Sequence, residues 1–457
     1  MTQKRATGSF AKARGLWAPI GNLEHDPCVL ALFKLANVGL AMLWGFAVTF
    51  VFVRLLPVEE FRAFLLLVAL ANFTVSADFG FSGIIYARLR RFRLGATEAR
   101  GAVDGEGAAF RPQDVAMLFA FMGLVVLVGA ALIGAGLASG HIGTQRPGLF
   151  IAFYLLTATN IFGILTKRAL AALDHNLLWD VIDAVRRSLS IALLLVALLG
   201  VPILLSVCVQ IALAVLALGF GLGVVHVSTG MRGSDWLLRG ARPGEVASGY
   251  MRDMGTTMAL TLSDVAAYNA PYFGIAAVTH DPRPLLVFDF VFKISRALTS
   301  VIRALTEAAL PRLTAAYHEG RIARARQIVG RLTLLSLVSA AVLGLGLLLA
   351  GSMLSRVLFA GKAVLTLSEL AGLAVLLFGL AMLCVSTYVH MGFGRFAALL
   401  PPSLAFLALS VLSVVAGAWV ARATGEPFAL CFVALYAVSH VVIALRHGRM
   451  LWGLVRG

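Results

Sequence analysis

Apolar runs of about 20 residues recur along nearly the whole chain, and short polar segments separate them. A run of that length forms a helix that crosses about 30 Å of hydrocarbon, where no water satisfies backbone polar groups. Only 13% of the 457 residues are charged, whereas a soluble domain carries about 25%. The pattern therefore predicts an all-α polytopic membrane protein.

The runs predict about twelve transmembrane helices in two six-helix lobes around a central cavity. We expect the spans at residues 30–53, 61–87, 114–139, 148–171, 178–199, 202–226, 247–278, 285–310, 328–352, 365–391, 396–421 and 427–446. The longest polar connection near the middle separates the two sets of six. The predicted parts are a basic cytosolic N-terminal tail (1–29), an N-lobe (30–226), a cytosolic connecting loop (227–246), a C-lobe (247–446) and a cytosolic C-terminal tail (447–457).

The net charge of +16 lies in short basic clusters between the apolar runs, as in membrane proteins, and does not indicate a nucleic-acid partner. Clusters follow the second and the eighth span: Arg88, Arg90, Arg91, Arg93 and Arg100, and then Arg312, Arg321, Arg324, Arg326 and Arg331. With the N-terminus inside, roughly 24 Lys and Arg lie on the cytosolic side, about 7 outside and about 7 within spans. Both termini are therefore expected in the cytosol.

One predicted span carries an unusual stripe of charge. In DFVFKISRALTSVIRALTE, residues 289–307, six polar residues are separated by steps of 4, 3, 4, 3 and 4: Asp289, Lys293, Arg296, Ser300, Arg303 and Glu307. That spacing places them on one helix face about 27 Å long. Charges facing lipid at mid-bilayer cost about 2.5 to 3.5 kcal/mol each. The face must therefore meet protein or water.

Other spans carry weaker polar faces. The first adds Lys34 and Asn37, the second adds Asp78, and the fifth and seventh add the following residues: Asp180, Asp183, Arg186, Arg187, Ser190, Asp253, Thr257, Thr261, Asp264, Tyr268 and Tyr272. The third, sixth, ninth and eleventh spans lack such a face. Two interpretations stay open. The polar faces line a water-filled cavity, or their charges, which sum to zero in each half when Arg252 of the seventh span is included, pair with one another.

Within the stripe, Asp289 and Lys293 are i,i+4 partners, and so are Arg303 and Glu307. Arg296 is left over, and its planar guanidinium suits a phosphate or pyrophosphate oxygen. We hypothesise that Arg296, helped by Lys293 and Arg303, holds an anionic headgroup. The other candidates for substrate binding in the cavity are Asp289, Arg187, Lys34 and Tyr268.

Two segments resemble bacterial polysaccharide (O-antigen type) flippases of the multidrug/oligosaccharidyl-lipid/polysaccharide exporter superfamily. Residues 36–91 have an Arg-Leu-Leu-Pro turn, an acidic pair and a D-x-G-x-S tail at Asp78, Gly80 and Ser82. Residues 290–325 are similar to the family's eighth helix, with its Pro-x-Leu exit into a basic loop. Arg62 departs from the pattern, since the family often has Gly there.

The resemblance implies a flippase in the bacterial inner membrane that moves a polyprenyl-pyrophosphate-linked oligosaccharide to the outer leaflet by alternating access between two lobes. It also implies association with polysaccharide assembly proteins. No GxxxxGK[ST] loop occurs, so we expect no cofactor and no ATPase, and transport that follows a lipid gradient or couples to H⁺ or Na⁺. Asp78 and Asp264 are the candidate ion-coupling residues, because neither has an opposite charge three or four residues away.

Four alternatives compete with this interpretation. A cation-coupled drug antiporter of the same superfamily would favour an acidic cavity. A lipid II flippase is close in mechanism, but that family typically has two further helices. A membrane enzyme acting on lipid-linked sugars needs a catalytic outer loop, and the outward loops here are short. A scaffold subunit would have no use for charges within the bilayer. We therefore expect a transporter and not an enzyme.

Overall fold

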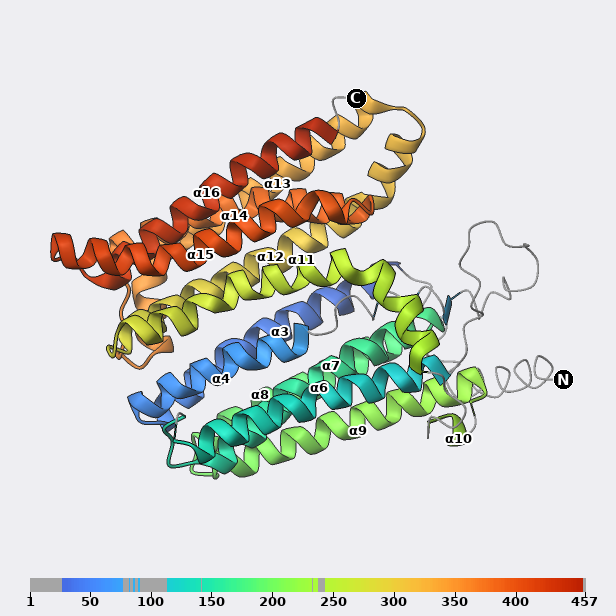
Figure 1. Cartoon of the computed structure of the whole chain (residues 1–457), viewed down its shortest axis with the longest axis horizontal. Helices are drawn as coiled ribbons and strands as arrows, with labels where there is room; N and C mark the ends of the chain where they lie inside the picture. Colours follow the sequence, from blue (N-terminus) through green and yellow to red (C-terminus); the bar gives the residue numbers. More distant parts are fainter. Residues whose placement is uncertain are drawn as a thin grey trace. The chain divides into compact units, whose positions relative to one another are not determined.

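Helices provide the regular structure of this protein in the computed structural model, which describes residues 27–76, 82, 85–86, 89–90, 113–140, 142–231, 233–236 and 243–454. Twelve helices of 19 residues or more lie in those ranges (Figure 1). They are α3 (Pro27–Leu55), α4 (Val58–Ser76), α6 (Gln113–Ala138), α7 (Pro147–Ala172), α8 (Asn176–Ala197), α9 (Ile203–Thr229), α11 (Pro243–Val278), α12 (Arg283–His318), α13 (Ile322–Leu358), α14 (Leu367–Gly392), α15 (Phe396–Thr424) and α16 (Phe428–Leu454), with the short α10 (Gly233–Trp236) before α11. The predicted all-α fold of about twelve long helices is confirmed.

Among the described residues, eight of these helices are long and apolar enough to cross a membrane: α3, α6, α7, α9, α13, α14, α15 and α16. The other four, α4, α8, α11 and α12, carry charged residues within their length. Many large apolar side chains on the eight apolar helices are exposed, which suits contact with lipid tails. The chain is therefore a multi-pass membrane protein.

Several helices extend past their predicted ends. Helix α12 continues to His318 and so includes Arg312, which was expected in a loop. Helix α13 begins at Ile322 and ends at Leu358, whereas 328–352 was predicted. Hydropathy marks only the part of a helix that lies in hydrocarbon, whereas the backbone hydrogen bonds continue through charged turns at either end. The loops are accordingly shorter than the sequence suggests.

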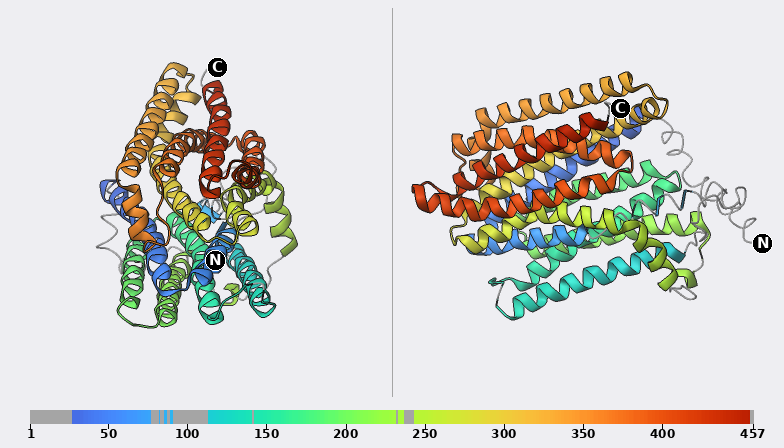
Figure 2. Two further views of the ribbon diagram at one scale, coloured as in Figure 1. Left: turned by 90° about the vertical axis from the view of Figure 1, so that its left-hand side faces the viewer. Right: turned by 45° about the horizontal axis from the view of Figure 1, so that its top comes forward.

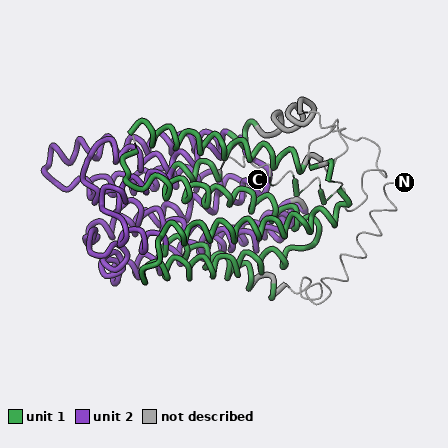
Figure 3. The backbone as a smooth tube through the Cα atoms, turned by 90° about the horizontal axis from the view of Figure 1, so that it is seen from below, with its two compact units in different colours: residues 1–47, 70–258 green, residues 48–69, 259–457 purple. Residues whose placement is uncertain are grey.

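The chain divides into two compact units, which Figure 3 distinguishes by colour. Unit 1 comprises residues 1–47 and 70–258, and unit 2 comprises residues 48–69 and 259–457. The end of α3 and the beginning of α4 thus belong to unit 2. The lobes predicted at 30–226 and 247–446 have different boundaries and stay a prediction of the functional division.

In unit 2, helices α13 to α16 pack side by side, with α14 next to both α13 and α16 (Figure 2). Glycine allows the closest approach. A Cβ atom on Gly379 of α14 would lie 2.9 Å from the carbonyl carbon of His440, and one on Gly417 of α15 would lie 3.1 Å from the Cα atom of Phe432. A Cβ atom at Gly379 would force the helices to shift, and one at Gly417 would be tighter than an ordinary contact, so the two glycines allow the close spacing of α14, α15 and α16.

A proline within α11 is compensated by α15. Pro271 has no N–H group, so the carbonyl oxygen of Ala267, four residues earlier, lacks its usual helical partner. The Ser410 hydroxyl of α15 donates a hydrogen bond of 2.5 Å to that oxygen. The polar backbone group freed by proline is therefore satisfied by a neighbouring helix, as membrane helices require.

Basic side chains fasten the α3–α4 turn within unit 2. Arg54 donates hydrogen bonds to the carbonyls of Val357 (2.6 Å) and Leu358 (3.3 Å) at the end of α13. Lys362 donates to the carbonyl of Val53 (2.6 Å) near the end of α3. Arg62 donates to three carbonyls at the end of α11, including that of Ala276 (2.5 Å). Each cation meets the negative end of a helix dipole, which accounts for Arg62 at this turn.

Candidate functional site

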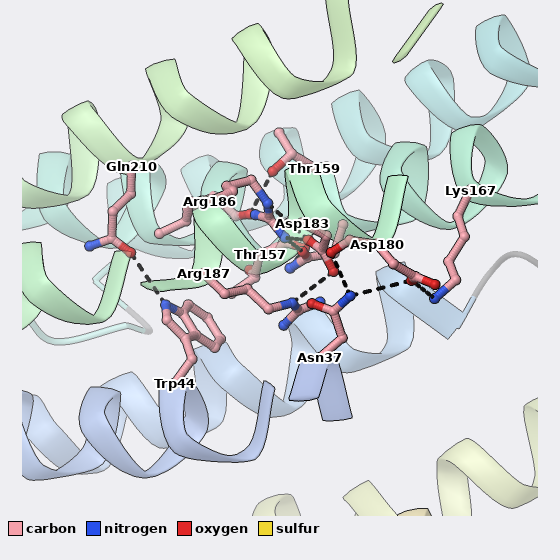
Figure 4. A network of polar contacts seen from close by, with 12 residues as sticks. Asn37, Trp44, Thr157, Thr159, Lys167, Asp180, Asp183, Arg186, Arg187 and Gln210 are labelled. Atoms are coloured by element: carbon pink, nitrogen blue, oxygen red, sulfur yellow. Dashed lines mark hydrogen bonds and ion pairs between the residues drawn. The ribbon is translucent and has the colours of Figure 1, made fainter. Parts of the chain in front are cut away.

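A polar cluster in unit 1 joins helices α3, α7, α8 and α9 (Figure 4). Asp180 of α8 is fully buried and forms an ion pair with Lys167 of α7 at 2.9 Å. The Asn37 side chain of α3 donates hydrogen bonds to the backbone carbonyl of Asp180 at 2.8 Å and to its carboxylate at 3.3 Å. On the other side of the cluster, the Trp44 indole N–H donates to Gln210 of α9 at 3.3 Å.

One acidic residue in this cluster holds two arginines. Asp183 pairs with Arg186 at 2.7 Å and with Arg187 at 2.8 Å, each bond reaching a different carboxylate oxygen. Together with Asp180 and Lys167 the cluster has two carboxylates and three cations, so one positive charge remains. Arg186 and Arg187 line a cavity of about 20 Å³, which is room for about one water molecule.

The remaining lining of that cavity is uncharged: Trp44, Leu156, Asn160, Ser190 and Gln210. Two guanidinium groups and no carboxylate therefore face the space. In Arg187 only the Nε atom bonds to Asp183, so its terminal nitrogens are left for another acceptor. This arrangement attracts an anion and repels a cation.

The stripe on α12 lies in unit 2, and its N-terminal part is buried in the protein. Asp289 is 0% exposed. Its carboxylate pairs with Lys293 and accepts hydrogen bonds from Tyr272 of α11 at 3.0 Å and Thr49 of α3 at 3.2 Å. The predicted pairing of Asp289 with Lys293 is confirmed. With four donor contacts its oxygens are satisfied, so this residue holds α3, α11 and α12 together.

The remainder of the stripe is more accessible. Arg303 pairs with Glu307 at 2.9 Å, as predicted, and both side chains are more than half exposed. Arg296 is also exposed. Its guanidinium lies 5.5 Å from the ring centre of Phe292, and it forms no ion pair with any residue of the described ranges. Of the stripe's three cations, only Arg296 is free to neutralise a ligand.

The predicted ion-coupling residue Asp264 lies on α11 in unit 2 and lines a second cavity, of about 30 Å³. Its carboxylate accepts a hydrogen bond from the Ser403 hydroxyl of α15. Tyr268, one turn further along α11, packs edge-on against Phe406 and also lines the cavity. His447 of α16 lines it as well. The cavity therefore brings a carboxylate, a phenol and an imidazole together.

The remaining predicted site residues lie outside these two sites or outside the residues that the structure describes. Lys34 is exposed on α3 and belongs to neither cluster. Asp78 and the side chain of Asp253 lie outside the described residues. Within the described part of the chain, no group of three or more His, Cys, Asp and Glu side chains could hold a metal ion.

Sequence reasoning missed several members of both clusters. Lys167, Gln210 and Ser403 come from spans that showed no polar stripe, and His447 lies at the start of the predicted C-terminal tail. The sixth and eleventh spans, now α9 and α15, were expected to lack polar faces, and they still contribute Gln210 and Ser403. A single polar residue in an apolar helix leaves no periodic signal. The one signal available was the cost of a lone Gln or Lys within a span, which predicts a buried partner.

Comparison with known proteins places this fold. No protein-family model and no curated protein sequence matches the chain. An inward-facing multidrug resistance MATE family transporter of the MOP superfamily is similar in structure, with a TM-score of 0.66 and 16% identity over 93% of this chain and 98% of that chain. An outward-facing structure described in the same words gives 0.63 and 14% over 93% and 95%.

The Vibrio cholerae MATE transporter VcmN in its bent form gives a TM-score of 0.56 and 14% identity over 93% of this chain and 97% of that chain. These likenesses extend over almost the full length of each chain and are likenesses of fold. The chain therefore has the fold of the MATE transporters. The narrower resemblance to polysaccharide flippases stays a prediction.

Proposed function

We propose that this protein is a transporter that flips a polyprenyl-pyrophosphate-linked oligosaccharide from the cytoplasmic to the outer leaflet by alternating access. The observation that carries the proposal is the state of the three cations in the stripe on α12. Lys293 and Arg303 are neutralised by Asp289 and Glu307, whereas Arg296 between them is exposed and unpaired among the described residues. An exposed guanidinium within a membrane helix needs an anion or water.

The chemistry of unit 1 supports an anionic substrate. Arg186 and Arg187 face the small cavity, and no carboxylate does. The cavity holds about one water molecule and is too small for a headgroup, so we assign to Arg187 an attraction for the pyrophosphate and not the enclosure of the sugar. A pyrophosphate offers the paired oxygens that a guanidinium binds with two parallel hydrogen bonds.

We further propose that the protein lies in the bacterial inner membrane with both termini in the cytosol. The excess of Lys and Arg in the connections that would then face the cytosol supports this orientation. Transport is proposed to couple to an ion at Asp264, with Asp78 as a second carrier. Association with polysaccharide assembly proteins would follow from this role.

A drug or cation antiporter is the second candidate, because the similar solved structures include multidrug transporters. Such an antiporter binds cations, for which an unpaired Arg296 and the two arginines of unit 1 are unfavourable. The two functions can be distinguished at position 296. A flippase of an anionic lipid requires a positive charge there, whereas an exporter of cations does not.

The test uses Arg296→Ala and Arg296→Glu in a reconstituted flipping assay with a fluorescent lipid-linked oligosaccharide, and in complementation of a flippase-null strain. Loss of a charge-assisted contact worth about 1.5 to 3 kcal/mol lowers transport by about 10-fold or more, and Arg296→Glu abolishes it. Arg331→Glu, an equal charge change at another exposed position on α13, serves as the control. Normal flipping by well-expressed Arg296→Glu would refute the proposal, and preserved drug export by that variant would favour the antiporter.

A further inference from the structure

We infer that Asp264 and His447 share one proton across the cavity in unit 2, so that the coupling ion is H⁺ and its carrier is a carboxylate–imidazole pair. The inference rests on the proposed coupling role of Asp264 and names the ion and the second acceptor. His447 was not a candidate from the sequence, because the predicted C-terminal tail (447–457) begins at this residue.

The first argument is the geometry of the cavity. Its lining comes from α11, α14, α15 and α16, and its titratable side chains are Asp264, Tyr268 and His447. The volume of about 30 Å³ accommodates about one water molecule. A single water that accepts from one group and donates to the other is sufficient to carry a proton between carboxylate and imidazole.

The second argument is that His447 is held by one of its ring nitrogens. Its Nδ1 atom lies 3.0 Å from the Ser386 hydroxyl of α14. The Ser386 carbonyl in turn accepts a hydrogen bond from Nδ1 of His390 at 2.8 Å. With Nδ1 engaged, the nitrogen of His447 that exchanges a proton across the cavity is Nε2. Ser386 is thus a positioning residue for the imidazole.

The third argument is the balance of charge. Without the proton, Asp264 is a carboxylate, His447 is neutral, and the pair has a charge of −1. When one proton enters, it resides on the carboxyl oxygen or on Nε2, and either form of the pair has zero charge. The Ser403 hydroxyl donates a hydrogen bond to Asp264, which stabilises the carboxylate form. A neutral pair costs less to enclose in a low-dielectric interior than an isolated charge.

The donors of this cavity favour H⁺ over Na⁺. A hard cation prefers a shell of oxygen ligands, whereas the polar group that α16 contributes to the cavity is the His447 imidazole, whose nitrogen binds a proton and is a poor ligand for Na⁺. Other titratable or charged groups lie near the pair, and α15 contributes none to the cavity. They are Tyr268 on α11, Cys384, Tyr388 and His390 on α14, and Tyr436, His440 and Arg446 on α16. Among them only Arg446 has a fixed charge, and it is exposed.

An infrared pH titration of the purified full-length protein tests the inference without a transport assay. The carbonyl stretching band of protonated Asp264 is identified as the band that disappears in the Asp264→Asn variant. If the pair shares a proton, His447→Gln removes an N–H donor that stabilises the carboxylate, and the pH midpoint of the band rises by about one unit or more. Ser386→Ala raises it by less, and His226→Gln, a histidine of unit 1 bonded to Trp236, leaves it unchanged.

An unchanged midpoint in His447→Gln overturns the inference, and so does loss of the wild-type band on addition of Na⁺ at constant pH. If His447→Gln does not elute as a folded protein in gel filtration, Ser386→Ala decides by the same criterion. Flipping is measured separately. A wild-type protein that shows the midpoint shift but flips no lipid-linked oligosaccharide would refute the proposed function and leave the shared proton standing.

Discussion

Two ion pairs on α12 have the same i,i+4 spacing and similar chemistry but differ in burial. Comparing them therefore measures how burial changes the contribution of an ion pair to stability. Lys293 pairs with Asp289, whose side chain is 1% exposed, and Arg303 pairs with Glu307, whose side chain is 63% exposed. We consider Lys293→Met and Arg303→Met, which replace each cation by an uncharged side chain of similar length.

The expected losses of unfolding free energy follow from the hydrogen-bond donors and solvent that each carboxylate keeps after its cation is removed. In Lys293→Met, Asp289 stays buried and keeps only the hydroxyls of Tyr272 and Thr49. Breaking a buried pair from one side costs about 3 to 5 kcal/mol, and the two remaining donors favour the lower limit. In Arg303→Met, Glu307 stays solvated, so the loss is about 1 kcal/mol or less.

The free energy of unfolding is measured in mild detergent by titration with a denaturing detergent, with the α12 variants compared under one condition. The double variant Asp289→Asn with Lys293→Met removes both charges and is expected to regain most of the loss, because the uncompensated charge is then absent. Equal destabilisation by Lys293→Met and Arg303→Met would show that burial does not determine the energy of these pairs. A double variant no more stable than Lys293→Met would show that the loss is one of packing.

Two further predictions concern helix packing in unit 2. Gly379→Ala places a Cβ atom against the backbone of His440 and is expected to cost about 1 to 3 kcal/mol in unfolding free energy, whereas Gly346→Ala, with nothing within 4 Å, is neutral or stabilises by up to about 1 kcal/mol. Ser410→Ala should cost about 1 to 3 kcal/mol in the wild type and clearly less in a Pro271→Ala background, where the helical N–H returns; equal costs in both backgrounds would contradict the compensation.

The sequence predicts those features of this structure that depend on one helix alone. Spacing along α12 predicted both ion pairs correctly, because i,i+4 contacts follow from helical geometry. It did not predict that Asp180 pairs with Lys167 or that Ser403 bonds to Asp264. Those contacts join different helices, and their formation depends on the rotation and depth of each helix in the packed unit, which the hydropathy period does not specify.

The stripe on α12 illustrates the same limit. Its spacing correctly places the polar residues on one face, but the surroundings of that face change along the helix. Helix α12 has 36 residues and is about 54 Å long, so neighbours that enclose it at Asp289 no longer cover it at Arg296 or Arg303. Of the two interpretations that the sequence left open, pairing describes Asp289, which is buried against Lys293, and the cavity role of Arg296 stays a prediction.

The four helices that fall short of the hydropathy expected of a membrane span account for most of the chemistry. Helix α8 provides Asp180, Asp183 and both cavity arginines, and α11 and α12 provide Asp264 and Arg296. The charges of α4 lie instead in its first turns, where Arg62 fastens the α3–α4 turn. A charge placed within a span must be paired or used. Within the stripe, Arg296 is the cation left without a carboxylate among the described residues. No ion pair of α12 explains its presence, which is why the charge-reversal test is placed at this residue.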